Sequence, residues 1–406
     1  MLIKNKLNLL IISGYYPPTI SIASNRILAF SKYLDVEKFN ITVITFGDDS
    51  GFIPPKGIDV IRINDQAFFS PLPFNKPHGF IIHKTKVVYN ILIREFFGNQ
   101  WKTWQKAVFR YIVKNYDKNA FDFVISSFAP EETHLVALQL KQQGYNFKWI
   151  ADMRDEMSRN LSLAESDRKK LKKIEERIFK EALAISSTAQ VATENFKKSS
   201  AKYQLDCFEV KNGYDFELPK TNQRNNVFTM SHIGSFYGKR KPDLFLKAVA
   251  QLLKSDQIKD IKIRFIGIAA NIPLPLLLKD KVEISQKIPH QKALEMMQES
   301  DANLLIIAPA QKGAIPGKIY EYMACLKPII GIFDEKLNQQ TADILKQSGL
   351  AYLSAFSDLE ALKAQLLKLY KDWKENDIQD YNIEYIQQFH RKAQVKIMEK
   401  YILQHA

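Results

Sequence analysis

Short runs of apolar, largely β-branched residues alternate with amphipathic segments of helical length along almost the whole chain. This alternation is typical of parallel β-sheets that helices cover on both faces. The first series of predicted strands is 9–13, 41–46, 60–63, 121–126, 147–151, 182–186 and 207–210, and the second is 230–233, 261–266, 282–284, 302–307, 328–332 and 351–353. Predicted helices between the strands include 24–34, 132–143, 244–253, 291–298, 319–324 and 358–370. We therefore expect an α/β protein with two series of strands.

A polar stretch at 215–226 (DFELPKTNQRNN) interrupts the alternation once. It is rich in Asn, Gln, Lys and Pro and has no periodicity, which is typical of a linker. We therefore predict one domain at 1–214, a linker at 215–226 and a second domain at 227–380, followed by a helical segment at 381–406. Two doubly wound, Rossmann-like domains would face each other across a cleft at the carboxyl ends of their strands, where such sheets bind ligands.

The composition excludes several classes of protein. The 406 residues include only two cysteines, Cys207 and Cys325, which lie in no CxxC pattern, so neither a disulfide framework nor a zinc site is indicated. The apolar run at 7–13 is too short for a signal peptide. No stretch reaches the roughly 20 apolar residues that span a bilayer. We expect a cytoplasmic protein, or one peripheral to the inner face of the cytoplasmic membrane.

The formal net charge of +14 attracts anions in general, whether nucleic acid, anionic lipid or phosphorylated substrates. Much of the charge is local, because segment 76–118 holds nine Lys or Arg against only Glu95 and Asp117, together with nine aromatic residues. Aromatic and basic residues together suit an anionic membrane surface. The alternative is that these aromatic residues belong to the core and the charges to a solvated face.

The segment 313–324 (GAIPGKIYEYMA) follows a predicted strand and begins a helix. Proline is tolerated in a first helical turn, and the free N–H groups of that turn attract anions. Lys318 would add a positive charge, and Glu321, one turn later, could accept hydrogen bonds from sugar hydroxyls. The segment thus offers a phosphate end and a ribose end. The alternative is an ordinary helix start with a local Lys–Glu pair.

A second segment, 232–242 (HIGSFYGKRKP), follows the first strand after the polar stretch. Gly234, Ser235 and Gly238 allow close approach of a ligand to the backbone, and Lys239, Arg240 and Lys241 supply positive charge. A diphosphate suits such a place, and a solvated basic turn is the alternative. Neither GxxxxGK[ST] nor GxGxxG occurs, so no P-loop or dinucleotide motif is indicated.

The loop 14–26 (GYYPPTISIASNR) joins the first predicted strand to the first helix. Ser24 is the expected N-cap, with Ser21 before it and Arg26 in the first turn. An ordinary capped helix is the alternative to a ligand-binding loop.

Two further groups of candidates follow strands of the first series. Asp152, Arg154 and Asp155 (in WIADMRDE) could bind hydroxyl groups, but we favour the interpretation that they pair with one another. His134 lies near the start of a helix, where a single histidine is more often structural. Its place after a strand nevertheless directs it toward the expected cleft.

In their order and spacing, these segments resemble the retaining GT-B glycosyltransferases of family 4, especially bacterial enzymes that build cell-surface polysaccharides. The resemblance runs from about Leu9 to Leu353. Its pieces are the YYPP loop with Ser24 and Arg26, DFVISSFAPEETHLVALQLK, WIADMRDE, VKNGYD, HIGSFYGKRKP, IPHQKALEMMQESDANLLI and PGKIYEYMACLKPIIG.

The resemblance implies a nucleotide-sugar donor site in the C-terminal domain and a last helix, 381–406, that packs back on the N-terminal domain. The residues expected at the donor diphosphate are Gly234, Ser235, Arg240, Gly317 and Lys318. Those expected at the nucleoside are Ile288, Pro289, Tyr320 and Glu321. His134 and Glu321 are the candidates for a catalytic role, and the acceptor side of the cleft would hold Ser21, Ser24, Arg26, Asp152, Arg154 and Asp155.

Three features depart from the family pattern. Gly313 stands where the family has the first of two paired glutamates, and Ser235 stands where it usually has an arginine. The first loop has residues 19–24 in place of the family's Gly-rich turn. The sequence therefore supports a grip on a nucleotide diphosphate better than any particular donor sugar.

The expected activity is transfer of a sugar, with retention, from a nucleotide-diphosphate sugar to a glycan or lipid-linked acceptor in surface polysaccharide biosynthesis. No Asp-x-Asp sequence occurs, so we expect neither a required metal nor a cofactor. One rival is a GT-B nucleotide-sugar epimerase. The other is a non-catalytic basic protein that binds nucleotides or nucleic acid, although no nucleic-acid-binding module is recognisable and we expect no nucleic-acid partner.

Overall fold

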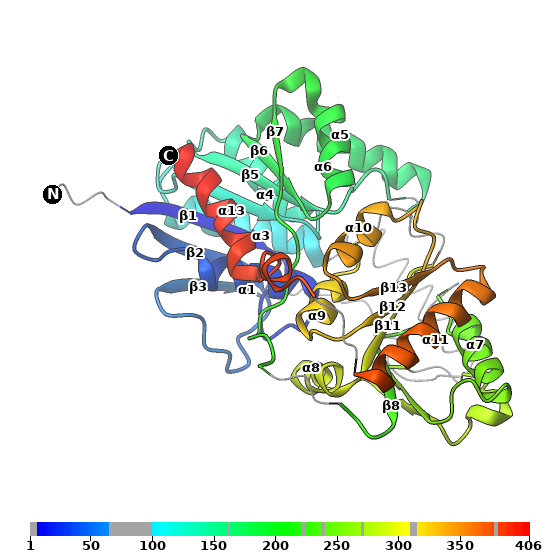
Figure 1. Cartoon of the computed structure of the whole chain (residues 1–406). Helices are drawn as coiled ribbons and strands as arrows, with labels where there is room; N and C mark the ends of the chain where they lie inside the picture. The colour runs from blue at the N-terminus through cyan, green and yellow to red at the C-terminus, as the bar shows by residue number, and fades with distance from the viewer. Residues whose placement is uncertain are drawn as a thin grey trace, which may run out of the picture. The chain divides into compact units, whose positions relative to one another are not determined.

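The computed structural model describes residues 6–64, 100–160, 163–220, 224–236, 240–268, 272–308, 315–376 and 381–406. The chain divides into two compact units. The first comprises Met1–Lys211 with Val395–Ala406, and the second comprises Asn212–Gln394. Each unit is built around its own parallel β-sheet (Figure 1).

The first unit contains a seven-stranded sheet in the order β3-β2-β1-β4-β5-β6-β7. Its strands are β1 (Leu7–Ser13), β2 (Phe39–Phe46), β3 (Ile58–Ile63), β4 (Phe123–Ser127), β5 (Lys148–Arg154), β6 (Ala184–Ser187) and β7 (Asp206–Glu209). All neighbouring pairs are parallel, and β1 pairs with β2 on one side and with β4 on the other. The strand order reverses at β1, so ligands are expected at the carboxyl ends of β1 and β4.

Helices cover both faces of this sheet. They are α1 (Ile22–Tyr33), α3 (Gln100–Asn115), α4 (Glu132–Gln142), α5 (Glu165–Glu181), α6 (Gln190–Ser200), the 3-10 turn η1 (Ala201–Tyr203) and α13 (Arg391–Gln404). The core on one face contains buried residues of α3, α4, α5 and α6. The core on the other contains residues of α1 and of the final helix, among them Ile27, Phe30, Met398 and Ile402.

The sequence of strand β1 does not alternate between apolar and polar residues, because both of its faces are buried. Leu10 and Ile12 lie in the first core, whereas Leu9 and Ile11 lie in the second. Successive side chains of a strand point to opposite faces, and a strand buried on both faces needs apolar residues at every position. Burying each such side chain contributes roughly 1.5–3 kcal/mol relative to exposure.

The second unit contains a six-stranded parallel sheet in the order β10-β9-β8-β11-β12-β13. Its strands are β8 (Phe228–Ile233), β9 (Ile261–Ile266), β10 (Val282–Ser285), β11 (Ala302–Ile306), β12 (Ile329–Ile332) and β13 (Ala351–Ser354). Its helices are α7 (Asp243–Lys254), η2 (Leu276–Leu278), α8 (His290–Glu299), α9 (Lys318–Ala324), α10 (Gln339–Gln347), α11 (Leu359–Glu375) and α12 (Ile383–Gln387). Two separate cores again lie on the two faces of the sheet.

These elements confirm the α/β class with parallel sheets that the sequence predicts, and each predicted strand is present. The described part of the polar stretch 215–226 forms no helix or strand. Phe216 and Leu218 of this stretch pack against a core of the second unit.

The prediction of one continuous helical segment at 381–406 is wrong, because α12 ends at Gln387 and α13 begins at Arg391. The backbone of Tyr214 forms hydrogen bonds with the residues between the two helices. Its N–H donates to Phe389 O at 3.2 Å, and its carbonyl accepts the Arg391 N–H at 2.9 Å. Gly213 permits this approach, since a Cβ there would overlap Phe389 O.

No helix among the residues placed by the structure is both long and apolar enough to cross a membrane.

Candidate functional site

Gly234 and Lys318 meet at the carboxyl edge of the second sheet. Gly234 directly follows β8, and Lys318 is the first residue of α9. A Cβ at position 234 would overlap the Nζ atom of Lys318, so the ammonium group lies directly over the glycine backbone. Gly234 also has a φ of +136°, which side chains other than glycine rarely adopt. The structure thus brings together two residues that the sequence assigns to the diphosphate.

Tyr322 explains why these two residues meet. Its hydroxyl, on α9, accepts a hydrogen bond from the Ile233 N–H, on β8, at 3.1 Å. The side chain is completely buried, and burial raises the pKa of its hydroxyl above the ordinary value. Because a buried polar group needs its partner, this bond fixes the start of α9 against the end of β8.

Lys318 is a buried cation in a positively charged neighbourhood. Its pKa is lowered to about 8, mainly by burial and then by the positive charge of Arg240, whereas Glu321 acts in the opposite direction. Among the described residues Lys318 forms no ion pair. A buried cation without a close counter-ion is costly, and a bound anion would remove that cost. The cluster is therefore suited to a phosphate or diphosphate.

His232 lies behind this cluster as a neutral residue. Burial lowers its pKa to about 3, and the charges of Lys318 and Arg240 contribute to the lowering. Its Nδ1 lies 2.8 Å from Leu304 O, so the neutral ring carries its proton there and donates it to the carbonyl. The ring stacks on Phe236 with centroids 4.4 Å apart. His232 therefore adds no charge to the site.

The expected anion site at the first turn of α9 needs correction. The Ile319 N–H is not free, because it donates to Pro316 O at 3.0 Å. Gly317 precedes the helix in a helical conformation with no side-chain cap. The attraction for an anion therefore rests on the side chain of Lys318 more than on the backbone of this short helix.

Glu321 lies on the same helix and has a partner that the sequence did not reveal. Its Oε1 lies 2.9 Å from His290 Nε2, and the Glu321 side chain is 15% exposed. His290 begins α8 directly after Ile288 and Pro289, so this contact brings the two predicted nucleobase residues close to Glu321. The signal for His290 was its place in the IPHQK segment.

The remaining predicted donor residues differ in exposure. Ser235 is exposed, and its hydroxyl donates to Gly267 O at 3.2 Å. Tyr320, expected at the nucleoside, is only 1% exposed and packs on Phe389 at 5.1 Å between ring centroids. A side chain buried in this way belongs to the core, which contradicts the prediction that Tyr320 contacts the nucleoside. Gly238, Lys239 and Gly313 lie outside the described residues.

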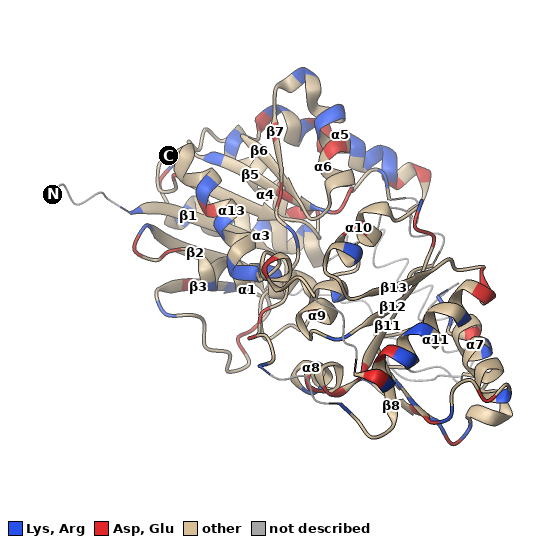
Figure 2. Ribbon diagram, in the orientation of Figure 1, with Lys and Arg blue, Asp and Glu red and all other residues tan. Residues whose placement is uncertain are grey.

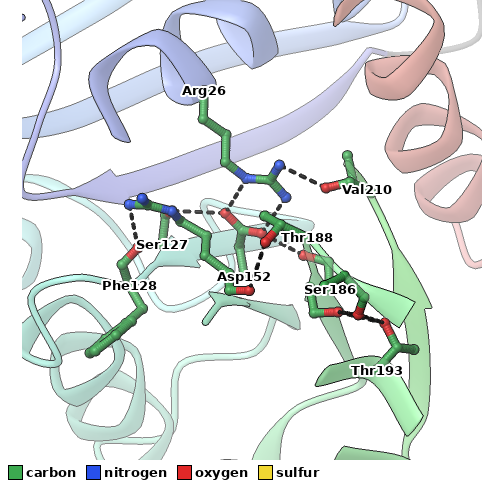
Figure 3. A network of polar contacts seen from close by, with 11 residues as sticks. Arg26, Ser127, Phe128, Asp152, Ser186, Thr188, Thr193 and Val210 are labelled. Carbon is green, nitrogen blue, oxygen red and sulfur yellow. Dashed lines mark hydrogen bonds and ion pairs between the residues drawn. The ribbon is translucent and has the colours of Figure 1, made fainter. Parts of the chain in front are cut away.

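In the first unit, the predicted candidates Arg26 and Asp152 pair with each other (Figure 3). Arg26 Nε donates to one carboxylate oxygen of Asp152 at 2.9 Å, and Nη2 donates to the other at 2.7 Å. Arg26 Nη1 donates to Val210 O at 2.8 Å. The favoured interpretation that Asp152 pairs with Arg154 or Asp155 is therefore wrong, since its partner lies 126 positions earlier in the chain.

This ion pair is buried and fully hydrogen-bonded. Arg26 and Asp152 are 4% and 0% exposed, and the hydroxyls of Ser127 and Ser186 each donate to Asp152 at 2.8 Å. Burial alone would raise the pKa of Asp152, but Arg26 and the two hydroxyls bring it below the ordinary value. The pair is thus a brace inside the unit, and its polar groups are not available to an acceptor.

The N-cap of helix α1 lies three residues earlier than predicted. Its N-cap is Ser21, whose side chain accepts the Ser24 N–H at 3.0 Å, and the prediction of Ser24 as N-cap is wrong. Ser24 is completely buried, and Arg26 lies in the second turn. The two serines stand three apart in SIAS, so either could cap a helix start, and the choice depended on packing.

Arg154 and Asp155 remain the best candidates for ligand contact in this unit. The pairing of β5 with β6 shifts between Asp152 and Arg154, and Arg154 adopts a φ of +56°. Such backbone strain in a non-glycine residue is frequent at functional sites. Arg154 Nη1 donates to Phe128 O at 2.8 Å, and burial lowers the pKa of its guanidinium. Asp155, the next residue, is exposed.

His134 is completely buried within α4. Ser126 Oγ accepts the indole N–H of Trp149 at 2.8 Å and lies 2.7 Å from His134 Nδ1, so the hydroxyl donates to the imidazole. Burial lowers the pKa of His134 to about 4. The neutral ring therefore carries its proton on Nε2, which has no hydrogen-bond partner among the described residues. This arrangement suits a hydrogen-bond donor and not a proton-transfer group at neutral pH.

Of the basic, aromatic segment 76–118, residues 76–99 lie outside the described part. In α3 the aromatic side chains face inward: Trp104 is buried, and Trp101, Phe109 and Tyr111 pack against the core. The basic side chains Lys102, Lys106, Arg110 and Lys114 are exposed. Their four-residue spacing places them along one side of the helix. In this described part the aromatic residues belong to the core, and the helix presents a basic stripe.

Comparison with known proteins agrees with this architecture. Residues 214–385 match the family model described as glycosyl transferases group 1. No curated protein matches the sequence. Two similar solved structures are the lipopolysaccharide outer core galactosyltransferase WaaB (TM-score 0.61, 11% identity, 98% of this chain and 100% of that chain covered) and OtsA (0.59, 10%, 97% and 99%). Another is WaaG, a glycosyltransferase involved in lipopolysaccharide biosynthesis (0.53, 13%, 97% and 99%).

The fold is GT-B. The two parallel-sheet units and these structural matches show it, as the sequence predicted. The match over 214–385 covers the second sheet and the Gly234–Lys318 site, and it supports a glycosyltransferase.

The buried pair gives a prediction about stability. Replacing Asp152→Asn leaves Arg26 buried without a counter-ion, and we expect the free energy of unfolding to fall by about 3–5 kcal/mol. Urea denaturation followed by circular dichroism measures the change. The matched control Asp155→Asn, at an exposed carboxylate, should stay within about 0.5 kcal/mol of wild type. A loss below 1 kcal/mol for Asp152→Asn would mean that the pair does not brace the unit.

The lowered pKa of Lys318 gives a prediction about pH. A bound diphosphate favours the charged amine, so we expect it to raise this pKa and to be taken up together with a proton between pH 8 and 10. Affinity for uridine, guanosine or adenosine diphosphate should fall as the pH rises through 8. Calorimetry in two buffers of different ionisation enthalpy measures the uptake. Lys318→Ala should abolish it, and equal uptake in that variant would refute the assignment.

Proposed function

We propose that the protein is a glycosyltransferase that moves a sugar from a nucleotide-diphosphate sugar to a glycan or lipid-linked acceptor. The observation that carries the proposal is the position of Lys318. Its ammonium group is buried over the backbone of Gly234, beside Arg240, and one turn before Glu321. A nucleotide diphosphate provides two negative phosphates for the cations and ribose hydroxyls for the carboxylate.

The donor would bind through groups whose chemistry differs along the site. Lys318 and Arg240 face the diphosphate, with Gly234 and Ser235 allowing its close approach. Glu321 accepts hydrogen bonds from the ribose, and His290 holds that carboxylate in place at 2.9 Å. Ile288 and Pro289, next to His290, offer apolar contact to the base. This order, from cation to carboxylate to apolar surface, matches the order of phosphate, ribose and base in a nucleotide.

Sugar transfer requires stabilisation of the departing nucleotide diphosphate. Negative charge grows on the diphosphate as the bond to the sugar breaks, and fixed positive groups in a dry site stabilise that charge most effectively. Lys318 is suited to this because it is buried and already near Arg240. We propose that these cations act without a required metal ion, and that the transfer proceeds with retention of the anomeric configuration.

In the first unit, we propose Arg154 and Asp155 as contacts to acceptor hydroxyls. The guanidinium of Arg154 is positioned by its hydrogen bond to Phe128 O, and Asp155 is exposed. His134 would contribute a hydrogen bond from Nε2, since its low pKa keeps it neutral. Arg26 and Asp152 have no direct part in this proposal, because their polar groups are already hydrogen-bonded within the unit.

We place the reaction in surface polysaccharide biosynthesis. WaaB and WaaG, which share the fold, are by their descriptions enzymes of lipopolysaccharide, and this supports the placement. An epimerase with the same fold would bind the same donor, but it would need no acceptor. Release of nucleotide diphosphate only when an acceptor is present separates the two activities.

The donor site is tested by binding of nucleotide diphosphates and nucleotide sugars. A ligand at about 100 times its Kd should add about 2.7 kcal/mol to the free energy of unfolding, which a thermal-shift panel detects. We expect Lys318→Ala to weaken binding about 10- to 100-fold, because a hydrogen bond to a charged group is worth about 1.5–3 kcal/mol. Glu321→Ala should weaken it about tenfold through loss of the ribose contact.

The matched control for these variants is Lys336→Ala, at an exposed lysine of the same unit. It should bind every ligand as wild type does. No shift with any uridine, guanosine or adenosine diphosphate would contradict the proposal, as would wild-type affinity in both site variants. A turnover assay tests retention through the new glycosidic bond of the product. The same anomeric configuration as in the donor supports retention, and the opposite configuration contradicts it.

We further propose that the basic stripe of α3, defined as Lys102, Lys106, Arg110 and Lys114, attracts the protein to the inner face of the cytoplasmic membrane. A basic residue near an anionic surface contributes about 1 kcal/mol. Removing two charges in Lys106→Gln/Lys114→Gln should therefore weaken sedimentation with anionic vesicles about 30-fold. Lys336→Gln/Lys371→Gln, which removes two exposed lysines of the second unit, is the control. Equal binding to neutral and anionic vesicles would overturn the proposal.

A further inference from the structure

A charged cavity lies in the first unit, formed by α5, the end of α6 and the loop after β5. Its volume is about 620 Å³, within the roughly 300–1,000 Å³ typical of small-molecule sites. It is lined from α5 by Arg168, Lys172 and Glu175, among others, and from the loop by Ser158 and Arg159. None of these residues belongs to the donor site or to the candidates for acceptor contact.

Within the described part of the chain, two of the lining cations have no carboxylate partner. Arg168 and Lys172 stand one turn apart on α5 and line the same cavity. Neither forms an ion pair within the described part of the chain, and the Nε atom of Arg168 is buried without a hydrogen-bond acceptor. Cations that line a cavity without a nearby carboxylate favour an anion in that cavity.

The other charges of the cavity are largely compensated. Lys169 pairs with Glu165 at 2.8 Å. Glu175 is 5% exposed and accepts hydrogen bonds from the backbone N–H and the hydroxyl of Ser158. The lining as a whole holds four basic residues and three glutamates (Glu165, Glu175 and Glu176), so its formal charge is +1. Figure 2 shows the density of basic residues along α5.

Across the cavity, a third cation is held in place by neighbouring groups. Arg159 Nη2 donates to Ser199 Oγ, on α6, at 3.1 Å, and its Nε lies 3.5 Å from a carboxylate oxygen of Glu156. The Glu175–Ser158 hydrogen bonds hold the loop that carries Arg159 against α5. Cations from two elements therefore converge on one cavity, and its arrangement does not depend on a single exposed side chain.

We propose that this cavity binds a phosphorylated sugar. Arginine presents several N–H groups in a fork that fits phosphate oxygens, and Lys172 adds a second charge one turn away. A phosphate alone would leave much of the cavity empty. The hydroxyl of Ser199 and the carboxylates at the cavity wall provide partners for sugar hydroxyls. The site does not depend on the proposed transfer reaction.

The test measures binding of glucose 1-phosphate, inorganic phosphate and unphosphorylated glucose by calorimetry. It uses the full chain carrying Lys318→Ala, so that the donor site does not contribute. We expect glucose 1-phosphate to bind most tightly and glucose most weakly. Arg168→Gln/Lys172→Gln should weaken binding of glucose 1-phosphate at least tenfold, as loss of charged hydrogen bonds implies. Lys172→Gln alone, at an exposed side chain that the fold does not need, should weaken it about threefold.

The matched control is Lys173→Gln/Lys180→Gln, which removes two charges from α5 outside the cavity. It should bind glucose 1-phosphate within twofold of the parent. Equal weakening in this control would overturn the proposal, because attraction to the helix charge would then explain the binding. Equal affinity for glucose and glucose 1-phosphate would also overturn it, as would equal affinity for inorganic phosphate. Diphosphate binding in the chain with native Lys318 is measured separately, so the two sites can fail independently.

Discussion

The first unit depends on the ion pair between Arg26 and Asp152. One carboxylate receives a bidentate arginine from α1 and hydroxyl groups from β4 and β6, and the same arginine reaches the carbonyl of Val210 after β7. A buried carboxylate is tolerated only when its hydrogen bonds are complete. The pair therefore fixes the carboxyl edge of several strands at once, including the end of β5 where Arg154 follows.

In the second unit, by contrast, the buried charge of Lys318 has no counter-ion among the described residues. Tyr322 and Gly234 position Lys318 with uncharged groups, and the described residues offer the ammonium group no ion pair. Its pKa of about 8 shows that the folded protein disfavours the charged form. A bound anion stabilises the charged form of Lys318, which burial disfavours. This interaction adds to the free energy of binding. The charges of Arg26 and Asp152 already neutralise each other in the folded protein, so an added anion would gain no comparable binding energy. The first pair is therefore structural, whereas Lys318 is suited to binding.

The pattern of apolar residues was sufficient to predict the strands, since a strand buried on both faces, such as β1, is apolar at every position. It could not assign long-range partners. Asp152 stands beside Arg154 in the sequence, yet its partner is Arg26, because the parallel sheet brings the end of β5 next to α1. In the seven-residue helix α9, periodicity was too short to tell that Tyr320 faces the core while Glu321 faces His290.

The same distinction applies to charge. The net charge of +14 predicted an affinity for anions but not its location. The structure divides it among a buried lysine over a glycine, a basic stripe on α3 and a cavity beside α5. These three places differ in how far they exclude water. The strength of their electrostatic interaction with an anion depends on this exclusion more than on the number of basic residues. A salt-sensitive membrane contact at α3 and a less screened phosphate contact at Lys318 can therefore coexist in one basic chain.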